Sequence, residues 1–265
     1  MKIEVLISCM HQENHEIVFR SNVQTDAVVI NQCEKDSVEE FDFKNKRGET
    51  CHCRFVCTTE RGLSRSRNMA IANAEDADVC LICDDDEYLF DDYPEKLTNA
   101  FNEVPNAAVI AFALDRKDHP KKFPDRKFKL GFKSIGQVSS LQIAFRRDLI
   151  NNAGVVFDVK MGSGTGNGGG EENMFLHTCR RRRLNMFYYP QVIATINATG
   201  KSKWFKGYTT QYFQNLGWVS RRIHGAFVGW LYITVWTLTH RKLYRSDSSM
   251  WNAYKSLLNG FCQKR

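Results

Sequence analysis

At 265 residues, with 43% hydrophobic and 25% charged side chains, the chain has the size of one globular domain or one domain with an appendage. This composition excludes disordered, collagen-like and disulfide-scaffolded proteins. The net charge of +7 favours an anionic partner, which can be nucleic acid, a membrane or a phosphorylated small molecule. Basic residues gather in three places: residues 116–133, residues 180–183 and the part after residue 201.

The first residues form an apolar run that is too short for a signal peptide and is typical of a β-strand. The nine cysteines show no metal-binding pattern. Cys51 and Cys53 form C-x-C and not C-x-x-C, and the sequence has no second pair that would complete a zinc site. We therefore expect reduced thiols in a cytosolic protein.

Short apolar runs alternate with helical patterns over the first half of the chain. Strands are predicted over residues 3–9, 26–31, 54–59, 78–83 and 107–114, and helices over residues 64–74 and 93–104. This alternation indicates an α/β protein with a mainly parallel sheet covered on both faces. In such sheets ligands bind beyond the carboxyl ends of the strands.

The second half begins with a charged stretch that we expect to be a long surface loop, residues 115–137. Residues 139–150 predict a strand that runs into a short helix. The glycine-rich residues 162–170 then lead into a helix with two acids in its first turn and arginines in its last. That charge order suits the helix dipole.

Aromatic helices are predicted from about residue 203 onward. The apolar part of the second one runs from Ala226 to Leu238, which is shorter than the about 20 residues that span a bilayer. Two interpretations remain open for it. It is a helix packed in the core, or it lies in the membrane interface with flanking arginines and lysines on anionic lipid.

Three consecutive aspartates, Asp84, Asp85 and Asp86, follow the apolar strand 78–83. Carboxylates repel one another, and a buried one requires a proton or a cation. Carboxylate oxygens select hard cations such as Mg²⁺ or Mn²⁺, which are usually shared with substrate phosphates. The alternative is a solvated acidic turn that precedes the next helix.

Two other segments carry chemistry. Ser64 or Ser66 can cap the helix 64–74, which places Arg65 and Arg67 in its first turn, where the dipole disfavours positive charge. These arginines either extend into solvent or meet a bound anion. The glycines of residues 162–170 give backbone freedom, and Glu171 and Glu172 either stabilise the helix start or include a general base.

Six segments occur in the order VLISCMHQ, VVINQ, TTERGLSRSRN, LICDDDEYL, FDVKMGSGTGNGGGEENMFLH and WFKGYTTQYF. Together they resemble bacterial family-two inverting glycosyltransferases of the capsular and exopolysaccharide type, over residues 3–217. The resemblance implies a GT-A fold, a Rossmann-like sheet flanked by helices. It also implies a nucleotide-sugar-binding and catalytic domain over residues 1–202, with C-terminal helices over residues 203–265.

Carried over by position, the resemblance implies that Asp84, on the ribose side, and Asp85 bind the nucleotide-sugar and that Asp86 holds Mn²⁺ or Mg²⁺. Arg67 resembles the nucleotide-contacting arginine of the family, and Ser8 and Cys9 lie at the edge of the first strand near the base.

Two positions depart from the family pattern. Asn31 and Gln32 stand where relatives often have an acid after the second strand, and an amide offers a uracil edge both a donor and an acceptor. No histidine stands near Asn197, so the metal would have fewer protein ligands or more water.

The resemblance makes Glu172 the catalytic base, with Glu171 as the second candidate. The implied reaction moves a sugar, with inversion, from a nucleotide-sugar that carries uridine to a hydroxyl of a glycan or lipid-linked oligosaccharide. The expected location is peripheral, at the inner face of the cell membrane on an anionic surface. Nucleic acid is not an expected partner.

Two alternatives stay open. A Mg²⁺-dependent nucleotidyl- or phosphotransferase needs the same acids and arginines, but it also needs a glycine loop after the first strand, and SCMHQENHE contains no glycine. A non-catalytic module that binds sugar or nucleic acid would use the basic and aromatic surface, and its binding to oligonucleotides would depend strongly on salt.

Overall fold

The computed structural model describes residues 1–115, 122–196 and 207–263. The strands are β1 (Ile3–Met10), β2 (Asp26–Gln32), β3 (Ser37–Lys44), β4 (Thr50–Thr58), β5 (Val79–Asp84), β6 (Glu87–Leu89), β7 (Val109–Asp115), β8 (Phe128–Lys129), β9 (Ile143–Arg146) and β10 (Met186–Ile196). The helices are α1 (Glu16–Arg20), α2 (Leu63–Asn73), α3 (Tyr93–Glu103), α4 (Phe132–Ile135), α5 (Arg147–Asn152), α6 (Glu171–Arg181), α7 (Thr210–Thr239), α8 (Arg241–Tyr244) and α9 (Met250–Cys262). A 3₁₀ turn, η1 (Ser140–Gln142), precedes β9.

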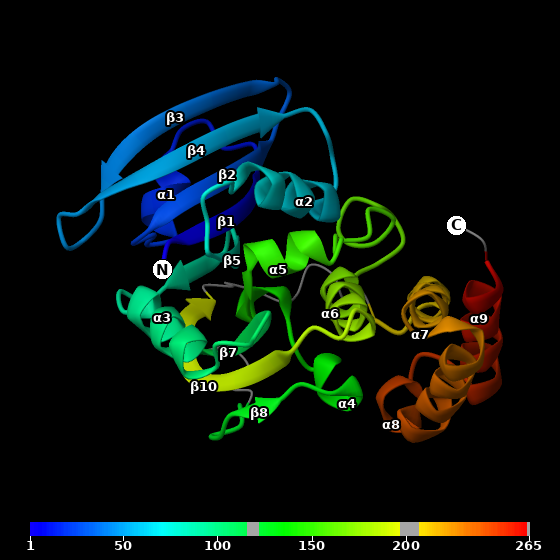
Figure 1. Ribbon diagram of the computed structural model, residues 1–265. Coiled ribbons are helices and arrows are strands. Elements are labelled where there is room, and N and C mark those ends of the chain that lie inside the picture. The colour runs from blue at the N-terminus through cyan, green and yellow to red at the C-terminus, as the bar shows by residue number, and fades with distance from the viewer. Residues whose placement is uncertain (116–121, 197–206, 264–265) are drawn as a thin grey trace.

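The strands form one mixed sheet in the order β3-β4-β2-β1-β5-β9-β7-β10-β6, with β8 also paired to β10 (Figure 1). The four neighbours β4, β2, β1 and β5 are parallel, as expected from their continuous apolar runs. Strand β9 separates them from the parallel pair β7 and β10 and runs antiparallel to both β5 and β7. The α/β fold class is confirmed.

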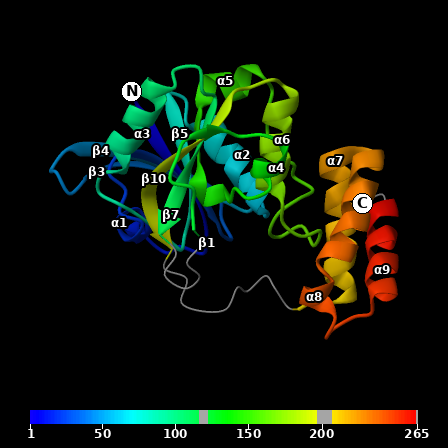
Figure 2. The same cartoon turned by 90° about the horizontal axis from the view of Figure 1, so that it is seen from below.

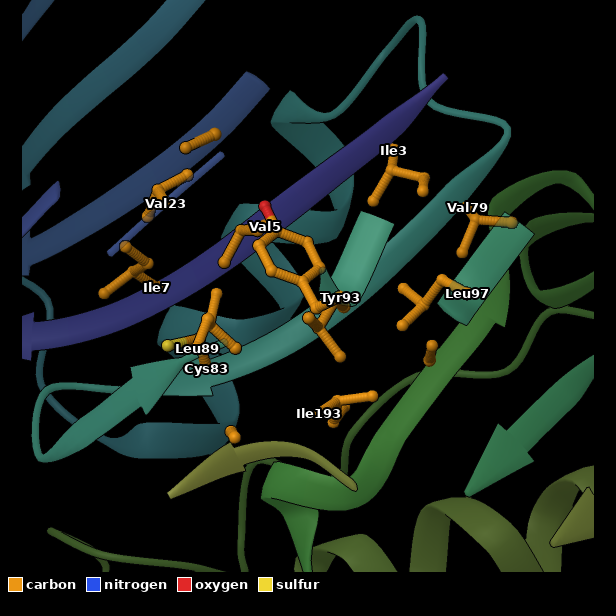
Figure 3. Packing of buried hydrophobic residues seen from close by; sticks show 14 of the residues in the cluster. Ile3, Val5, Ile7, Val23, Val79, Cys83, Leu89, Tyr93, Leu97 and Ile193 are labelled. Carbon is orange, nitrogen blue, oxygen red and sulfur yellow. The ribbon is translucent and has the colours of Figure 1, made fainter. Parts of the chain in front are cut away.

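Both faces of the sheet are buried by helices. Val5 and Ile7 of β1 belong to a cluster with α1 and α3, whereas Leu6 belongs to a cluster with α2, α4, α5 and α6. Figure 3 shows the first cluster, in which side chains of β1 and Leu97 of α3 surround the ring of Tyr93. Because successive strand residues point to opposite faces, an apolar run in the sequence supplies two cores at once.

Four strands were not predicted, β3, β6, β8 and β10, and two of them, β3 and β10, have a clear physical reason. Strand β3 reads SVEEFDFK and is mostly exposed at the sheet edge, so it lacks an apolar run. Strand β10 contains Pro190, which removes a ladder hydrogen bond, and the strand accommodates it with register shifts between Tyr189 and Ala194. The expectation of one loop over residues 115–137 is wrong in part, because β8 and α4 lie within it.

The C-terminal helices form a bundle at one side of the molecule (Figures 1 and 2). Helix α7 bends sharply at Gly225, whose φ is 78°, and the half after the bend folds back so that Trp236 lies against Phe213. Helix α9 packs closely on α7: a Cβ added to Gly217 would lie 2.0 Å from the Leu257 carbonyl oxygen, and one added to Gly260 would lie 1.8 Å from that of Gln214. Glycine is required at both contacts.

The domain boundary expected between residues 202 and 203, and the position of Asn197, lie outside the described residues. The boundary remains a prediction. In the part of the chain that the structure describes, no helix is both long enough and apolar enough to cross a bilayer. All nine cysteines are free thiols.

Candidate active site

The carboxyl ends of three neighbouring strands bring most of the predicted nucleotide-binding residues to one edge of the sheet. Ser8 of β1 stands opposite Asp84 of β5, and Cys9 stands opposite Asn31 of β2. Gln32 follows in the same register. Parallel pairing makes these ends meet, although up to 75 residues of sequence lie between them.

The two amides at the end of β2 are engaged within the protein. The Asn31 side chain accepts from the backbone N–H of Gln12 at 2.9 Å and donates to the carbonyl of the same residue at 2.9 Å. The side-chain oxygen Oε1 of Gln32 accepts from the backbone N–H of Gly62 at 2.7 Å. These bonds hold the loops after β1 and β4 against β2, so the amides organise the edge in this structure. Their contact with a base remains a prediction.

Ser8 and Cys9 lie deeper than a simple strand end suggests. The Ser8 hydroxyl accepts from the Ser66 hydroxyl at 2.9 Å, which ties β1 to α2. The Cys9 thiol is 2% exposed and donates to the Ile30 carbonyl at 3.6 Å. Burial raises the pKa of this thiol well above its usual range. Cys9 is therefore a packing residue at this edge and not a nucleophile.

Helix α2 does not use the serine cap that we expected. Its N-cap is Gly62, with φ 120°, and Ser64 instead donates from its hydroxyl to the Met161 carbonyl at 2.8 Å. The expectation of a cap at Ser64 or Ser66 is wrong, because both hydroxyls are bound to residues distant in sequence. Arg65, in contrast, is exposed and lies 3.9 Å from Glu60.

Arg67 is the centre of the site. Its guanidinium is 1% exposed and bridges two carboxylates, with 2.9 Å from Nη1 to Glu171 Oε1 and 3.0 Å from Nη2 to Asp84 Oδ1 (α2, α6 and β5 in Figure 1). It also lies 5.5 Å from the ring of Phe157. Burial opposes its charge and the two carboxylates favour it, with the net result that its pKa is raised. Arg67, in the first turn of α2, thus binds carboxylates of the same chain. No sequence pattern predicts this pairing.

The acids after β5 differ in their surroundings. Asp84 is half-buried against Arg67, whereas Asp85 and Asp86 are exposed. Glu87 is 2% exposed, and burial, assisted by Asp84, raises its pKa well above the usual range. The exposed carboxylates beside Asp84 are oxygen donors of the kind that Mg²⁺ and Mn²⁺ prefer.

Within the described ranges, no three His, Cys, Asp or Glu side chains are grouped so that they could hold a metal ion by themselves. One or two carboxylates with the remaining positions filled by substrate phosphate and water is the usual arrangement for Mg²⁺. The donor set at residues 84–86 therefore fits a cation that is shared with a diphosphate.

The glycine-rich loop lies between α2 and the C-terminal helices. Gly162, Gly164, Gly166, Gly168 and Gly170 all have positive φ, as expected for a segment that needs backbone freedom. A Cβ on Gly162 would lie 3.2 Å from the Ser64 hydroxyl and 3.3 Å from the Glu171 carboxyl carbon. This glycine gives Glu171 the room to reach Arg67.

Glu171 and Glu172 have different environments, although they are adjacent. Glu171 is 6% exposed, and its carboxylate is bound to the Arg67 guanidinium. Burial, with the neighbouring charge of Glu171 as the next cause, raises the pKa of Glu172 to about 7. A carboxylate with a pKa near the working pH is suited to general-base catalysis.

Sequence reasoning missed the contribution of α7 to this site. Arg222 donates to both oxygens of Asp158, at 2.5 Å from Nε and 3.0 Å from Nη2, and so holds the start of the glycine loop. Met161 of the loop is fully buried against Trp218 and Ile223. Only the paired charges Asp158 and Arg222 could have signalled this contact, and 64 residues separate them.

A cavity of about 650 Å³ opens beyond the ends of β1 and β2. Its lining includes Gln12, His15, Lys35, Phe55 and Cys57. The volume is in the range of small-molecule sites. The cavity is lined by neither Arg67 nor Glu172, so it lies beside the ionic centre and not over it.

Comparison with known proteins gives a family and a fold. The family model described as "Glycosyl transferase family 2" matches residues 8–163, more than half of the chain. Among curated proteins none matches the sequence.

The solved structures that resemble the chain include residues 1–349 of TarS from S. aureus, with 12% identity, a TM-score of 0.63, and coverage of 99% of this chain and 81% of that one. The same TarS fragment in complex with UDP-GlcNAc has 12% identity and a TM-score of 0.62, over 93% of this chain and 74% of that one. Its complex with UDP matches over the same shares, with 12% identity and a TM-score of 0.58. At this identity the likeness shows the fold alone, and it confirms the GT-A type.

Proposed function

The chain belongs to glycosyl transferase family 2, and from this premise we propose that it transfers a sugar from a UDP-sugar to an acceptor hydroxyl, with inversion at the anomeric carbon. The nucleotide part is supported by solved structures of the same fold that were determined with UDP and UDP-GlcNAc. The observation that carries the proposal is the bridge of Arg67 to Asp84 and Glu171, which brings the strand-end acids and the start of α6 together.

In the proposed reaction, Glu172 removes the proton of the attacking acceptor hydroxyl. The hydroxyl oxygen then forms a bond to the anomeric carbon while the bond from that carbon to the donor phosphate oxygen breaks, and UDP leaves with the bonding electrons. A single displacement of this kind inverts the anomeric centre. Arg67 positions Asp84 at the donor and keeps Glu171 paired, so that only Glu172 is available as the base.

Metal dependence is part of the proposal. Asp86 would be a ligand of Mn²⁺ or Mg²⁺, with Asp84 and Asp85 at the nucleotide-sugar. When bound, the cation neutralises charge on the departing diphosphate as a Lewis acid. We expect turnover to require Mn²⁺ or Mg²⁺ and to disappear in excess chelator. Asp86→Ala should abolish turnover and weaken UDP binding, and full activity in chelator would refute the metal requirement.

The donor and the product are tested together. UDP-, GDP- and dTDP-sugars are each incubated with Mn²⁺, and the released nucleotide is identified. Release of UDP supports the proposal, and release of free diphosphate indicates a nucleotidyltransferase. Release of another nucleoside diphosphate would show that the donor carries that nucleotide instead of UDP. Loss of UDP release in Glu172→Gln excludes contaminating enzymes.

The acceptor is proposed to be a growing capsular or exopolysaccharide precursor linked to lipid, with the enzyme bound peripherally at the inner face of the cell membrane. Lipid-linked acceptors lie at that surface, and the basic, aromatic C-terminal helices are compatible with it. Transfer of labelled sugar to a lipid extract, but not to free oligosaccharide, would support this acceptor class. Equal transfer to both would refute the requirement for lipid.

A further inference from the structure

Helix α7 is apolar on its outward side after the bend at Gly225. Phe227, Leu231, Val235 and Leu238 are 72%, 40%, 56% and 61% exposed. Their spacing of four, four and three residues puts them on one stripe of the helix. We call these four residues the α7 stripe.

The opposite side of the same segment is already packed. Gly229, Ile233 and Trp236 are buried, the latter two in a cluster with Phe213 and Leu257. The segment is thus apolar on both sides, and the described part of the chain covers only one of them. A helix that is hydrophobic on every side is found inside a protein or in contact with lipid. The α7 stripe is the side that is left uncovered, and it is therefore a candidate surface for a binding partner.

The exposed apolar surface is concentrated in this region. Among the described residues, more than half of the exposed large apolar side chains fall between Phe227 and Trp251. They include Trp230, Tyr232 and Trp251, whose rings are amphipathic and suited to the headgroup level of a membrane. Scattered exposed apolar residues are ordinary, whereas a concentration of this kind marks an interaction surface.

Charge identifies the partner. Between residues 207 and 263 the sequence has six Lys and Arg residues and one acidic residue, Asp247. Arg241, Lys242 and Arg245 are exposed directly after α7. Like charges on two copies of this surface would repel each other, whereas anionic lipid complements them. No described helix can cross a bilayer, so the contact would lie in the plane of the interface.

We propose that the α7 stripe, with Arg241, Lys242 and Arg245 beside it, is the surface that docks this protein on an anionic membrane. The inference rests on the proposed function in one respect. The proposed lipid-linked acceptor explains why this enzyme would bind a membrane. Docking itself requires neither donor nor turnover.

The test is co-sedimentation of the full chain with vesicles of phosphatidylcholine alone or mixed with phosphatidylglycerol. We expect binding to the anionic vesicles that weakens as salt rises, and little binding to the neutral ones. The variant F227S/L231S/L238S should bind at least tenfold more weakly. The control F19S/V38S/V156S removes three apolar side chains that are as exposed on the sheet domain, and it should bind like the wild type.

A second variant tests the charges. R241Q/K242Q/R245Q removes three charges, each of which contributes on the order of fivefold to binding near an anionic surface, so a loss of tenfold to a hundredfold is expected. Absence of vesicle binding by the wild type, or equal binding by the stripe variant and its control, overturns the proposal. Light scattering that shows a wild-type dimer which the stripe variant dissolves, without lipid binding, assigns the surface to a second copy instead.

The outcomes for docking and for catalysis are separable. A wild type that releases UDP but does not bind the anionic vesicles refutes the docking surface alone. Vesicle binding without any release of UDP refutes the proposed reaction alone.

Discussion

The sheet edge around Arg67 and the bundle of C-terminal helices solve opposite problems. At the edge, a guanidinium that is 1% exposed is compensated by two carboxylates from distant segments, so a buried charge is paired within the chain. On the bundle, apolar side chains up to 72% exposed are left uncovered by the residues that the structure describes. The difference teaches that the first region pairs its buried charge within the chain, whereas the second leaves apolar surface that the proposed partner would cover.

The largest expected effect separates the two acids at the start of α6. Glu172→Gln keeps the shape and removes the base, so transfer should fall by about 10²- to 10⁴-fold while UDP affinity stays nearly unchanged. Rates of labelled-sugar transfer and UDP titrations measure the two quantities. A similar loss of UDP affinity would mean that Glu172 binds the donor.

Glu171→Gln should act on stability instead. Removing one partner of a buried ion pair leaves part of the Arg67 charge uncompensated, which costs about 3–5 kcal/mol of unfolding free energy. Urea unfolding measures it, and Glu60→Gln, which breaks the exposed contact of Glu60 with Arg65, should change stability by less than about 0.5 kcal/mol. If Glu171→Gln is stable but loses transfer as Glu172→Gln should, Glu171 is the base.

The close contact between α7 and α9 predicts the next effect. Gly260→Ala would place a Cβ 1.8 Å from the Gln214 carbonyl oxygen, a backbone atom that cannot turn away, so the bundle should be destabilised by about 3 kcal/mol. Hydrogen exchange should quicken in residues 210–262 and stay unchanged in β1 and β5. Gly136→Ala, where the added Cβ has nothing nearer than 4.0 Å, serves as the control.

The smallest effect is the pH profile. Because burial raises the pKa of Glu172 to about 7 and the base must be ionised, the transfer rate should rise about tenfold per pH unit below 7 and level off above it. Because the folded pKa is raised from an ordinary value of 4.5, the wild type should lose stability relative to Glu172→Gln as the pH rises from there to about 7, and the difference should level off above it. A profile that is flat from pH 5 to 8 would contradict the assignment.

Sequence patterns predicted the parallel centre of the sheet well, because runs such as IEVLISC and DVCLIC are apolar on both faces. They failed at β3 and β10, where edge exposure and Pro190 remove the pattern and only pairing with a neighbour makes a strand. They also singled out Asp84, Arg67 and Glu171, which the structure brings together at the sheet edge, whereas the roles of these residues and of Glu172 remain predictions. The assignment of Asn31 and Gln32 to base recognition remains a prediction beside the internal bonds that they make.

By itself, the sequence determined the α/β class, the strand-end acids, the glycine loop and the apolar length of residues 226–238, because each depends on residues near one another in the chain. Only the tertiary structure decided which acids Arg67 holds, and that Glu171 and not Glu172 is one of them. It alone decided that α7 clamps the glycine loop through Arg222 and Asp158, and which side of its second half stays uncovered. Ion pairs and burial arise from contacts between segments that are distant in sequence, and a local sequence pattern does not predict such contacts.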